Sequence, residues 1–175
     1  MNFQKLITAL AEFFSERNIP YMLVGGFAVA YWGYPRQSMD IDIVIDLNRE
    51  NIGDFIKDAK EYGFIIHAPE AKAMVAKGNR FVMEWHAFRI DCWLPRTRFE
   101  KQALENRTRK KLFGQNLWII SAEDLIISKL LIGRPRDLED IKTVRLRQGR
   151  KIKRAYIKEE AQLLGLSEQL KVASL

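Results

Sequence analysis

The most constraining feature of the sequence lies in the first third of the chain, where an apolar run, two glycines and an alternation of acids with aliphatic residues follow one another. The run Tyr21 to Val24 predicts a short buried strand, which Gly25-Gly26 interrupts. Further on, the segment Met39 to Asp46 alternates carboxylates with aliphatic side chains. At the period of a strand, Asp40 and Asp42 share one face and the aliphatic residues share the other. The sequence thus predicts a strand that presents two carboxylates on one side.

The remaining segments predict strands early in the chain and helices late, which is typical of an α+β sheet with helical flanks. Apolar residues recur at helical spacing from Phe3 to Phe14, so we expect a helix that ends before Pro20. Ser121 with an acid at Asp124 is the pattern of a capping box and predicts that another helix begins there. Other expected helices lie at Phe27 to Trp32, Asn51 to Tyr62, Arg98 to Asn106, Asp137 to Arg147 and Ala155 to Leu164, and other strands at Phe64 to Ile66, Arg80 to His86, Phe88 to Trp93 and Leu117 to Ile120.

Length and composition indicate one domain in a reducing environment. The chain has 175 residues and no repeat or linker, so we treat residues 1–175 as one unit, with a sheet-containing core at 1–120 and a helical extension at 121–175. The single cysteine, Cys92, cannot form an intramolecular disulfide, which fits a cytoplasmic protein. No apolar run approaches the roughly 18 residues of a spanning helix, so we expect no membrane association.

The charge balance favours an anionic partner. The formal net charge is +7, and positive potential raises the local concentration of phosphates. The densest basic segment, Arg145 to Arg154, has two interpretations: it binds RNA or DNA phosphates, or it is a solvated junction between helices.

Asp91 is a third acid in an unusual context. It lies in the mainly apolar segment Phe88 to Trp93, where an unpaired charge is costly to bury. Either a metal ion or a salt bridge to an arginine would compensate its charge. Because Mg²⁺ prefers carboxylate, phosphate and water oxygens, Asp40, Asp42 and Asp91 are the candidate ligands of a metal site. Two such ions can clamp the attacking and leaving oxygens of nucleotidyl transfer.

The two glycines suit the other half of that chemistry. Without a Cβ, Gly25 and Gly26 let backbone N–H groups approach phosphates at the start of a helix. A plain tight turn is the alternative explanation.

These segments together resemble the signature of the DNA polymerase β-like nucleotidyltransferase superfamily, which is an apolar strand, Gly-Gly or Gly-Ser, a gap, and then Asp-x-Asp. The form Arg36-x-Ser38-x-Asp40-x-Asp42 is similar to small bacterial and archaeal nucleotidyltransferases related to AbiEii-type toxins. The resemblance implies the polymerase β-like fold, with a mixed central sheet flanked by helices and a helical C-terminal region. It also implies an NTP substrate and two Mg²⁺ ions, with Mn²⁺ as the alternative.

The same resemblance assigns roles to individual residues. It implies that Gly25 and Gly26 contact the triphosphate, that Asp40 and Asp42 hold both metal ions, and that Asp91 completes one metal site and helps to activate the nucleophile.

Four further residues receive roles from the resemblance. Ser38 and Lys129 would contact phosphate, and Arg36 would contact phosphate, brace its loop or form an ordinary ion pair. Arg80, at the end of Lys77 to Arg80, would be either a nucleotide contact or part of a hairpin turn with solvated charges. We expect Asp137 to cap a helix and form an ion pair rather than act in catalysis.

The sequence therefore predicts a metal-dependent enzyme that moves an NMP from an NTP, ATP included, to a hydroxyl of RNA, protein or a small molecule. A toxin–antitoxin role, with a cognate antitoxin as partner, follows by analogy alone. Two alternatives stay open: a non-catalytic module that binds nucleotide or nucleic acid, and a subunit that needs a partner protein. We expect the four tryptophans mainly in the core, with base stacking by one of them as the alternative: Trp32, Trp85, Trp93 and Trp118. We expect neither His67 nor His86 to be catalytic.

Overall fold

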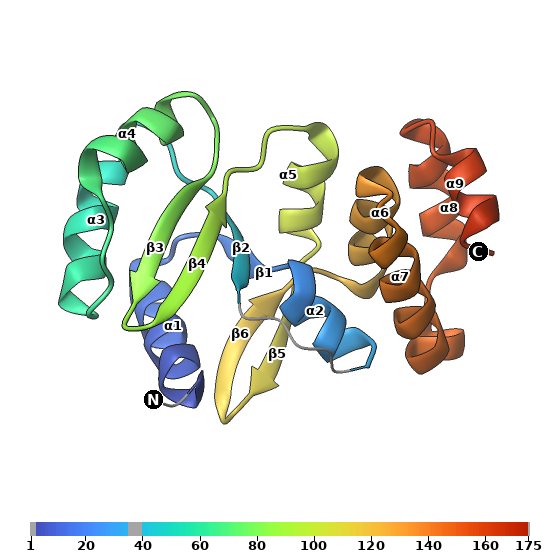
Figure 1. The fold of residues 1–175 in the computed structure, drawn as a ribbon, viewed down its shortest axis with the longest axis horizontal. Coiled ribbons are helices and arrows are strands. Elements are labelled where there is room, and N and C mark those ends of the chain that lie inside the picture. The colour runs from blue at the N-terminus through green and yellow to red at the C-terminus, as the bar shows by residue number, and fades with distance from the viewer. Residues whose placement is uncertain (1–2, 35–39, 175) are drawn as a thin grey trace.

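The structure is a computed structural model that describes residues 3–34 and 40–174, so the predicted site residues Arg36 and Ser38 lie outside the described residues. Its centre is a six-stranded sheet in the order β3-β4-β2-β1-β6-β5 (Figure 1). The strands are β1 (Tyr21–Leu23), β2 (Ile41–Ile45), β3 (Phe81–Trp85), β4 (Phe88–Trp93), β5 (Thr108–Leu112) and β6 (Gln115–Ile119).

Helices flank this sheet, and those at the end of the chain gather at one side of the molecule, beyond α5 (Figure 1). They are α1 (Phe3–Arg17), α2 (Gly25–Trp32), α3 (Ile52–Glu61), α4 (Ala68–Ala76), α5 (Arg98–Glu105), α6 (Ala122–Ile132), α7 (Pro135–Gln148), the 3-10 helix η1 (Gly149–Lys151), α8 (Arg154–Leu163) and α9 (Ser167–Val172). The predicted α+β architecture is confirmed. No helix in residues 3–34 or 40–174 is both long and apolar enough to cross a membrane.

The sheet is mixed, as the resemblance implies. Strand β2 pairs antiparallel with β1 and parallel with β4, and β1 also pairs parallel with β6. In β2 the isoleucines Ile41, Ile43 and Ile45 are buried, while Asp42 and Val44 are half-buried. The period-two pattern of the sequence therefore buries one face of β2 in the core and leaves the carboxylate on the other.

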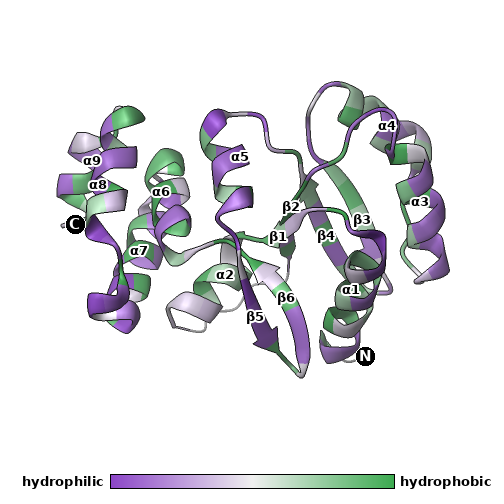
Figure 2. Cartoon of the chain, turned by 180° about the vertical axis from the view of Figure 1, so that it is seen from behind, coloured by the Kyte–Doolittle hydropathy of each residue, from purple (hydrophilic) through white to green (hydrophobic). Residues whose placement is uncertain are grey.

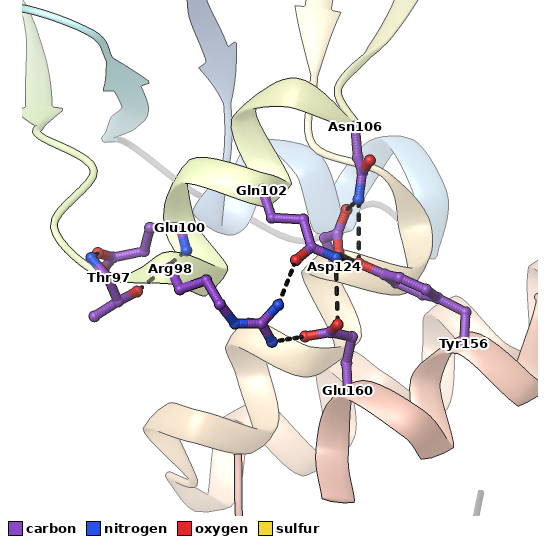
Figure 3. Close-up of polar contacts among 8 residues, drawn as sticks. All are labelled: Thr97, Arg98, Glu100, Gln102, Asn106, Asp124, Tyr156 and Glu160. Carbon is purple, nitrogen blue, oxygen red and sulfur yellow. Dashed lines mark hydrogen bonds and ion pairs between the residues drawn. The ribbon is translucent and has the colours of Figure 1, made fainter. Parts of the chain in front are cut away.

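A polar network joins the C-terminal helices to α5 (Figure 3). The Tyr156 hydroxyl donates to Asp124 Oδ1 at 2.6 Å, and Arg98 donates to Glu160 at 2.9 Å. Burial, and then the hydrogen bond to Asp124, raise the pKa of Tyr156. Because Asp124 is fully buried on α6, and its oxygens accept from three side chains, the network fixes how α8 packs on α5 and α6.

The helix start at Ser121 is confirmed, with one change. The Ser121 hydroxyl accepts from the Asp124 backbone N–H at 3.0 Å, and it donates to the Asp124 carboxylate at 2.6 Å. Ser121 therefore caps α6, and the Asp124 carboxylate binds the hydroxyl of that capping serine.

The secondary structure differs from the sequence prediction in four places. The predicted strand Phe64 to Ile66 is wrong, because only Ile65 forms an isolated bridge, to Glu84, and a helix missed in the sequence, α4, follows. Strand β5 was also missed, because it is an edge strand with three consecutive basic residues and lacks a clear apolar alternation. Figure 2 shows β5 as hydrophilic along most of its length. The short helix α9 was not predicted.

Candidate active site

Two predicted acids lie side by side in the centre of the sheet. Asp42 on β2 is in register with Asp91 on the parallel strand β4. Asp40, just before β2, is exposed, and its charge also acts on Asp42. The fold thus brings carboxylates from two separate segments to one place, as the sequence predicts.

Burial, together with nearby negative charges, makes the ionised form of Asp42 unfavourable. Burial is the main reason that the pKa of Asp42 is raised, and the negative charges of Asp91 and Asp40 raise it further. A hydrogen bond from the Trp93 indole N–H, 3.2 Å from Oδ1, and the charge of Lys129 act in the opposite direction. Converging carboxylates whose repulsion is only partly compensated provide a suitable oxygen donor set for a divalent cation.

Asp91 is held by two arginines. Its Oδ1 accepts from Arg80 at 2.6 Å and from the Nε and Nη2 of Arg89 at 3.2 and 3.1 Å. The side chain is almost buried, so these charge-assisted bonds compensate a charge that is otherwise costly. The salt-bridge interpretation of Asp91 is therefore what the structure shows. A metal role for Asp91 and a nucleotide contact for Arg80 stay predictions.

The two-ion site also stays a prediction. Within the described ranges, no group of three or more His, Cys, Asp or Glu side chains is arranged to hold a metal ion. The oxygen chemistry of Asp42 and Asp91 nevertheless fits Mg²⁺, and a cation bound there would compete with Arg80 and Arg89 for Asp91.

Gly25 explains why a glycine is needed next to the acids. It begins α2 with φ of 59°, and a Cβ built on it would lie 2.3 Å from Oδ2 of Asp42. The carboxylate therefore sits directly against the start of α2, where the first backbone N–H groups have no partner within the helix. The positive end of the helix dipole favours phosphate and carboxylate there. Gly26, the next residue, is buried.

We expect Gly25→Ala to remove activity and to destabilise the fold by roughly 1–2 kcal/mol, because the new methyl group clashes with Asp42 and an alanine is strained at positive φ. The matched control is Gly53→Ala in α3, where a Cβ would meet nothing within 4 Å. This substitution should stabilise the helix by up to about 1 kcal/mol. Urea denaturation and a transfer assay measure both effects. Equal behaviour of the two variants would contradict the close approach at Gly25.

Lys129 does not lie where a solvent-facing phosphate contact would be expected. Its ammonium is buried on α6 and donates to Asp137 Oδ1 and Asp140 Oδ2, each at 2.7 Å. Burial alone would raise the pKa of Asp137, but hydrogen bonds from Arg134 and Lys129 outweigh it and lower the pKa to about 2. Asp137 also accepts from the Arg134 backbone N–H at 3.1 Å, as its predicted helix-capping role requires. The phosphate contact of Lys129 stays a prediction.

Sequence reasoning missed three residues of the site. Trp93 was expected in the core, but 43% of it is exposed, and its ring lies beneath the Arg80 guanidinium. The signal was available, because Trp93 follows Asp91 by two positions and so shares its face of β4. Arg89 lies two positions before Asp91 on β4 and forms an ion pair with it. The charge of Arg134, the residue before α7, interacts with that of Asp42. Both histidines are exposed, as expected.

Replacing Trp93 by phenylalanine should move the acidic limb of the activity profile to higher pH. The substitution removes the indole N–H that stabilises ionised Asp42, so the pKa of Asp42 should rise further. Rates measured from pH 5 to 9 would show the shift. An unchanged acidic limb would mean that Asp42 does not need to be ionised in the rate-determining state.

Comparison with known proteins identifies related folds. A family model described as "Nucleotidyltransferase of unknown function (DUF6036)" matches residues 2–159. The comparison with curated proteins gives no significant match.

Several solved structures are similar over most of their length. ANT(2")-Ia in complex with adenylyl-2"-tobramycin has a TM-score of 0.59 at 16% identity, covering 90% of this chain and 97% of that one. The lincosamide antibiotic adenylyltransferase LnuA, in a lincomycin-bound form, has a TM-score of 0.54 at 19% identity, covering 83% of this chain and 97% of that one. An antigenic nucleotidyltransferase-like protein from Paracoccidioides brasiliensis has a TM-score of 0.56 at 17% identity, covering 97% of this chain and 91% of that one. At these identities the likeness shows the fold.

Proposed function

The chain belongs to the family of nucleotidyltransferases of unknown function whose model spans residues 2–159, and from this premise we propose that it moves an NMP from a metal-bound NTP to a hydroxyl acceptor. This membership confirms the resemblance to polymerase β-like nucleotidyltransferases and makes the protein an enzyme of that class. The metal requirement, the acceptor and the kinship to AbiEii-type toxins are parts of the proposal.

One observation carries the proposal. Asp42 and Asp91 occupy paired positions on parallel strands, and Gly25 leaves no room for a side chain between Asp42 and the start of α2. A helix start that can receive phosphate therefore lies against carboxylates that can hold a cation. Burial, and then the negative charges of Asp91 and Asp40, raise the pKa of Asp42, and a divalent cation bound between the acids would relieve that repulsion.

The chain's residues have distinct roles in the proposed reaction. The N–H groups at Gly25 and Gly26 bind the triphosphate, and Asp40, Asp42 and Asp91 hold the divalent ions. Those ions, when bound, neutralise charge on the triphosphate and on the leaving pyrophosphate.

In the transfer step, the acceptor oxygen forms a bond to the α-phosphorus while the bond between that phosphorus and the bridging oxygen to the β-phosphate breaks. The hydroxyl proton passes to a carboxylate oxygen of Asp91, and pyrophosphate leaves with the electrons of the broken bond. Arg80 and Arg89 orient Asp91 through Oδ1.

The acceptor is tested most directly by offering each class in parallel. The protein is incubated with each α-labelled NTP, Mg²⁺ or Mn²⁺, and one of three pools: cellular RNA, cellular protein, or small hydroxylated compounds including an aminoglycoside and a lincosamide. We expect label in one pool, and none when EDTA is added. Nucleotide binding without label in any pool would favour the non-catalytic module, and label that appears only after cell extract is added would favour the subunit that needs a partner.

A further inference from the structure

A concave region lies along α2, and the acids of the candidate active site do not line it. It is a groove of about 770 Å³ bounded by the start of α1, by α2, by the β5–β6 hairpin and by the junction of α7 with η1. Figure 1 shows these four segments along the lower side of the molecule. None of the residues predicted for the active site lines this groove.

Aromatic rings form one part of the groove. Phe113, in the turn of the hairpin, is 53% exposed, and its ring centroid lies 5.9 Å from that of Phe3. Phe3 in turn packs 5.8 Å from Phe27 of α2. Trp32 is anchored by an indole N–H bond of 2.8 Å to the carbonyl oxygen of Ile120. A row of rings that begins with an exposed phenylalanine can stack against flat, unpaired bases.

Cations form the other part. Lys110 of β5 lies 5.2 Å above the Trp32 ring, Arg147 of α7 donates to the Gly33 carbonyl oxygen, and Lys151 of η1 is exposed. Among the residues that the structure describes, no ion pair joins these three side chains to a carboxylate. Three positive charges without an acidic partner, close to the exposed ring of Phe113, favour an anionic ligand.

The groove and the acids share structural elements. Phe27 and Trp32 lie on α2, which begins at Gly25 beside Asp42. At a rise of 1.5 Å per residue, the far end of α2 lies about 10 Å from Gly25. Phe3 also contacts Phe88, the first residue of the strand that carries Asp91, with ring centroids 6.0 Å apart. A chain bound in the groove would therefore be close to the site of transfer.

We propose that this groove binds a single-stranded polynucleotide, with bases on the row of rings that begins at the exposed Phe113 and phosphates on Lys110, Arg147 and Lys151. Two members of the basic segment, Arg147 and Lys151, line the groove together with Lys110 of β5, so the proposal takes up the nucleic-acid interpretation of that segment. Paired bases would not expose their faces to these rings, so a duplex should bind less well. The binding is independent of the proposed function, whereas the role of the polynucleotide as acceptor rests on it.

Fluorescence anisotropy with a labelled, unstructured RNA tests the groove, with single-stranded DNA of the same sequence and the RNA duplex as parallel probes. The first variant is Lys110→Gln/Arg147→Gln/Lys151→Gln. Its matched control, Lys57→Gln/Lys72→Gln/Lys101→Gln, removes the same charge from exposed lysines on α3, α4 and α5. The second variant is Phe113→Ser, an exposed position whose replacement should leave the fold intact.

We expect the groove variant to reduce the slope of log affinity against log salt by about 2, at roughly 0.7 per phosphate contact. Phe113→Ser should weaken binding by about fivefold or more with little change in slope, since it removes stacking rather than charge. The control should change neither quantity comparably. Equal affinities for RNA and single-stranded DNA would support recognition through bases and phosphates. A higher affinity for RNA would support the same recognition with an additional contribution from the ribose.

Three results would overturn the inference: equal loss in the control variant, equal affinity for the duplex, or no binding at low salt. If the protein labels a small molecule but binds no polynucleotide, the inference fails and the proposed function stands. If it binds polynucleotide through the groove but transfers nucleotide to nothing, the inference stands and the proposed function fails.

Discussion

Asp42→Asn should lower the rate of nucleotidyl transfer by about a thousandfold while leaving the protein at least as stable as the wild type near pH 7. The catalytic loss follows from the proposed function, because the variant keeps the shape of the side chain and loses the charge that is proposed to hold a divalent ion. Such an ion contributes several kcal/mol of transition-state stabilisation, and about 4 kcal/mol corresponds to a thousandfold in rate.

The stability of this variant follows from the direction of the pKa shift. Burial, and then Asp91 and Asp40, raise the pKa of Asp42 in the folded protein above its ordinary value of 3.8. A carboxyl shifted in this direction favours folding when protonated, below the ordinary value, and that contribution is lost as the pH rises through the folded pKa. At neutral pH the ionised group therefore opposes folding, and a neutral asparagine removes the opposition.

Asp46→Asn is the matched control for Asp42→Asn. Asp46 directly follows the same strand, and its side chain is exposed. Transfer rates and urea midpoints of both variants distinguish the effect of losing a charge at the acid site from the effect of losing one at the end of the strand. Equal activity of the two variants, or marked destabilisation by Asp42→Asn, would contradict the account of the acid pair.

Lys129→Met should destabilise the protein by about 3–5 kcal/mol, because it removes a buried ammonium that forms ion pairs with two buried carboxylates, Asp137 and Asp140. Lys129 is 4% exposed, so solvent cannot replace the lost ammonium. Urea denaturation measures the loss. The matched control is Lys171→Met, which breaks an exposed pair with Glu168 and should cost less than about 1 kcal/mol.

The same variants separate a structural role of Lys129 from a phosphate contact. If the ammonium only organises the helical junction, Lys129→Met/Asp140→Asn should recover part of the lost stability and bind NTP with an unchanged dissociation constant. A dissociation constant that rises in the folded variant would support the phosphate contact implied by the resemblance. A loss below about 1 kcal/mol in Lys129→Met would contradict the importance of the buried ion pairs.

Most of the fold could be predicted because its central strands carry strong local patterns. The alternation in β2 predicts which side of that strand is buried, and Gly25-Gly26 mark the break between β1 and the next helix; the structure agrees with both. The edge strand β5 could not be found this way, since its consecutive basic residues bury little and its pairing with β6 is a tertiary feature. Phe64 to Ile66 fails for the opposite reason: the segment is apolar, but the chain turns into α4 before a ladder forms.

The site was predictable in its acids and not in its cations. Local spacing places Asp40 and Asp42 on one face of a strand and Arg89 two residues from Asp91, but Arg80 reaches Asp91 only through the β3–β4 pairing. The burial of Lys129 likewise arises from the packing of α7 on α6, so sequence alone could not distinguish an ion pair from a phosphate contact. Trp93 was misassigned because a large aromatic side chain in a strand is usually buried.

The fate of the two ends of the triphosphate tests the central claim most directly. The protein is incubated with the acceptor pool that takes up label and with ATP, or whichever NTP that pool requires, labelled either at the α- or at the γ-phosphate. Wild type should place α-label in the acceptor and release γ-label as pyrophosphate, and Asp40→Ala/Asp42→Ala should do neither. Label from the γ-position in the acceptor, or undiminished α-transfer by the double variant, would contradict nucleotidyl transfer at these acids.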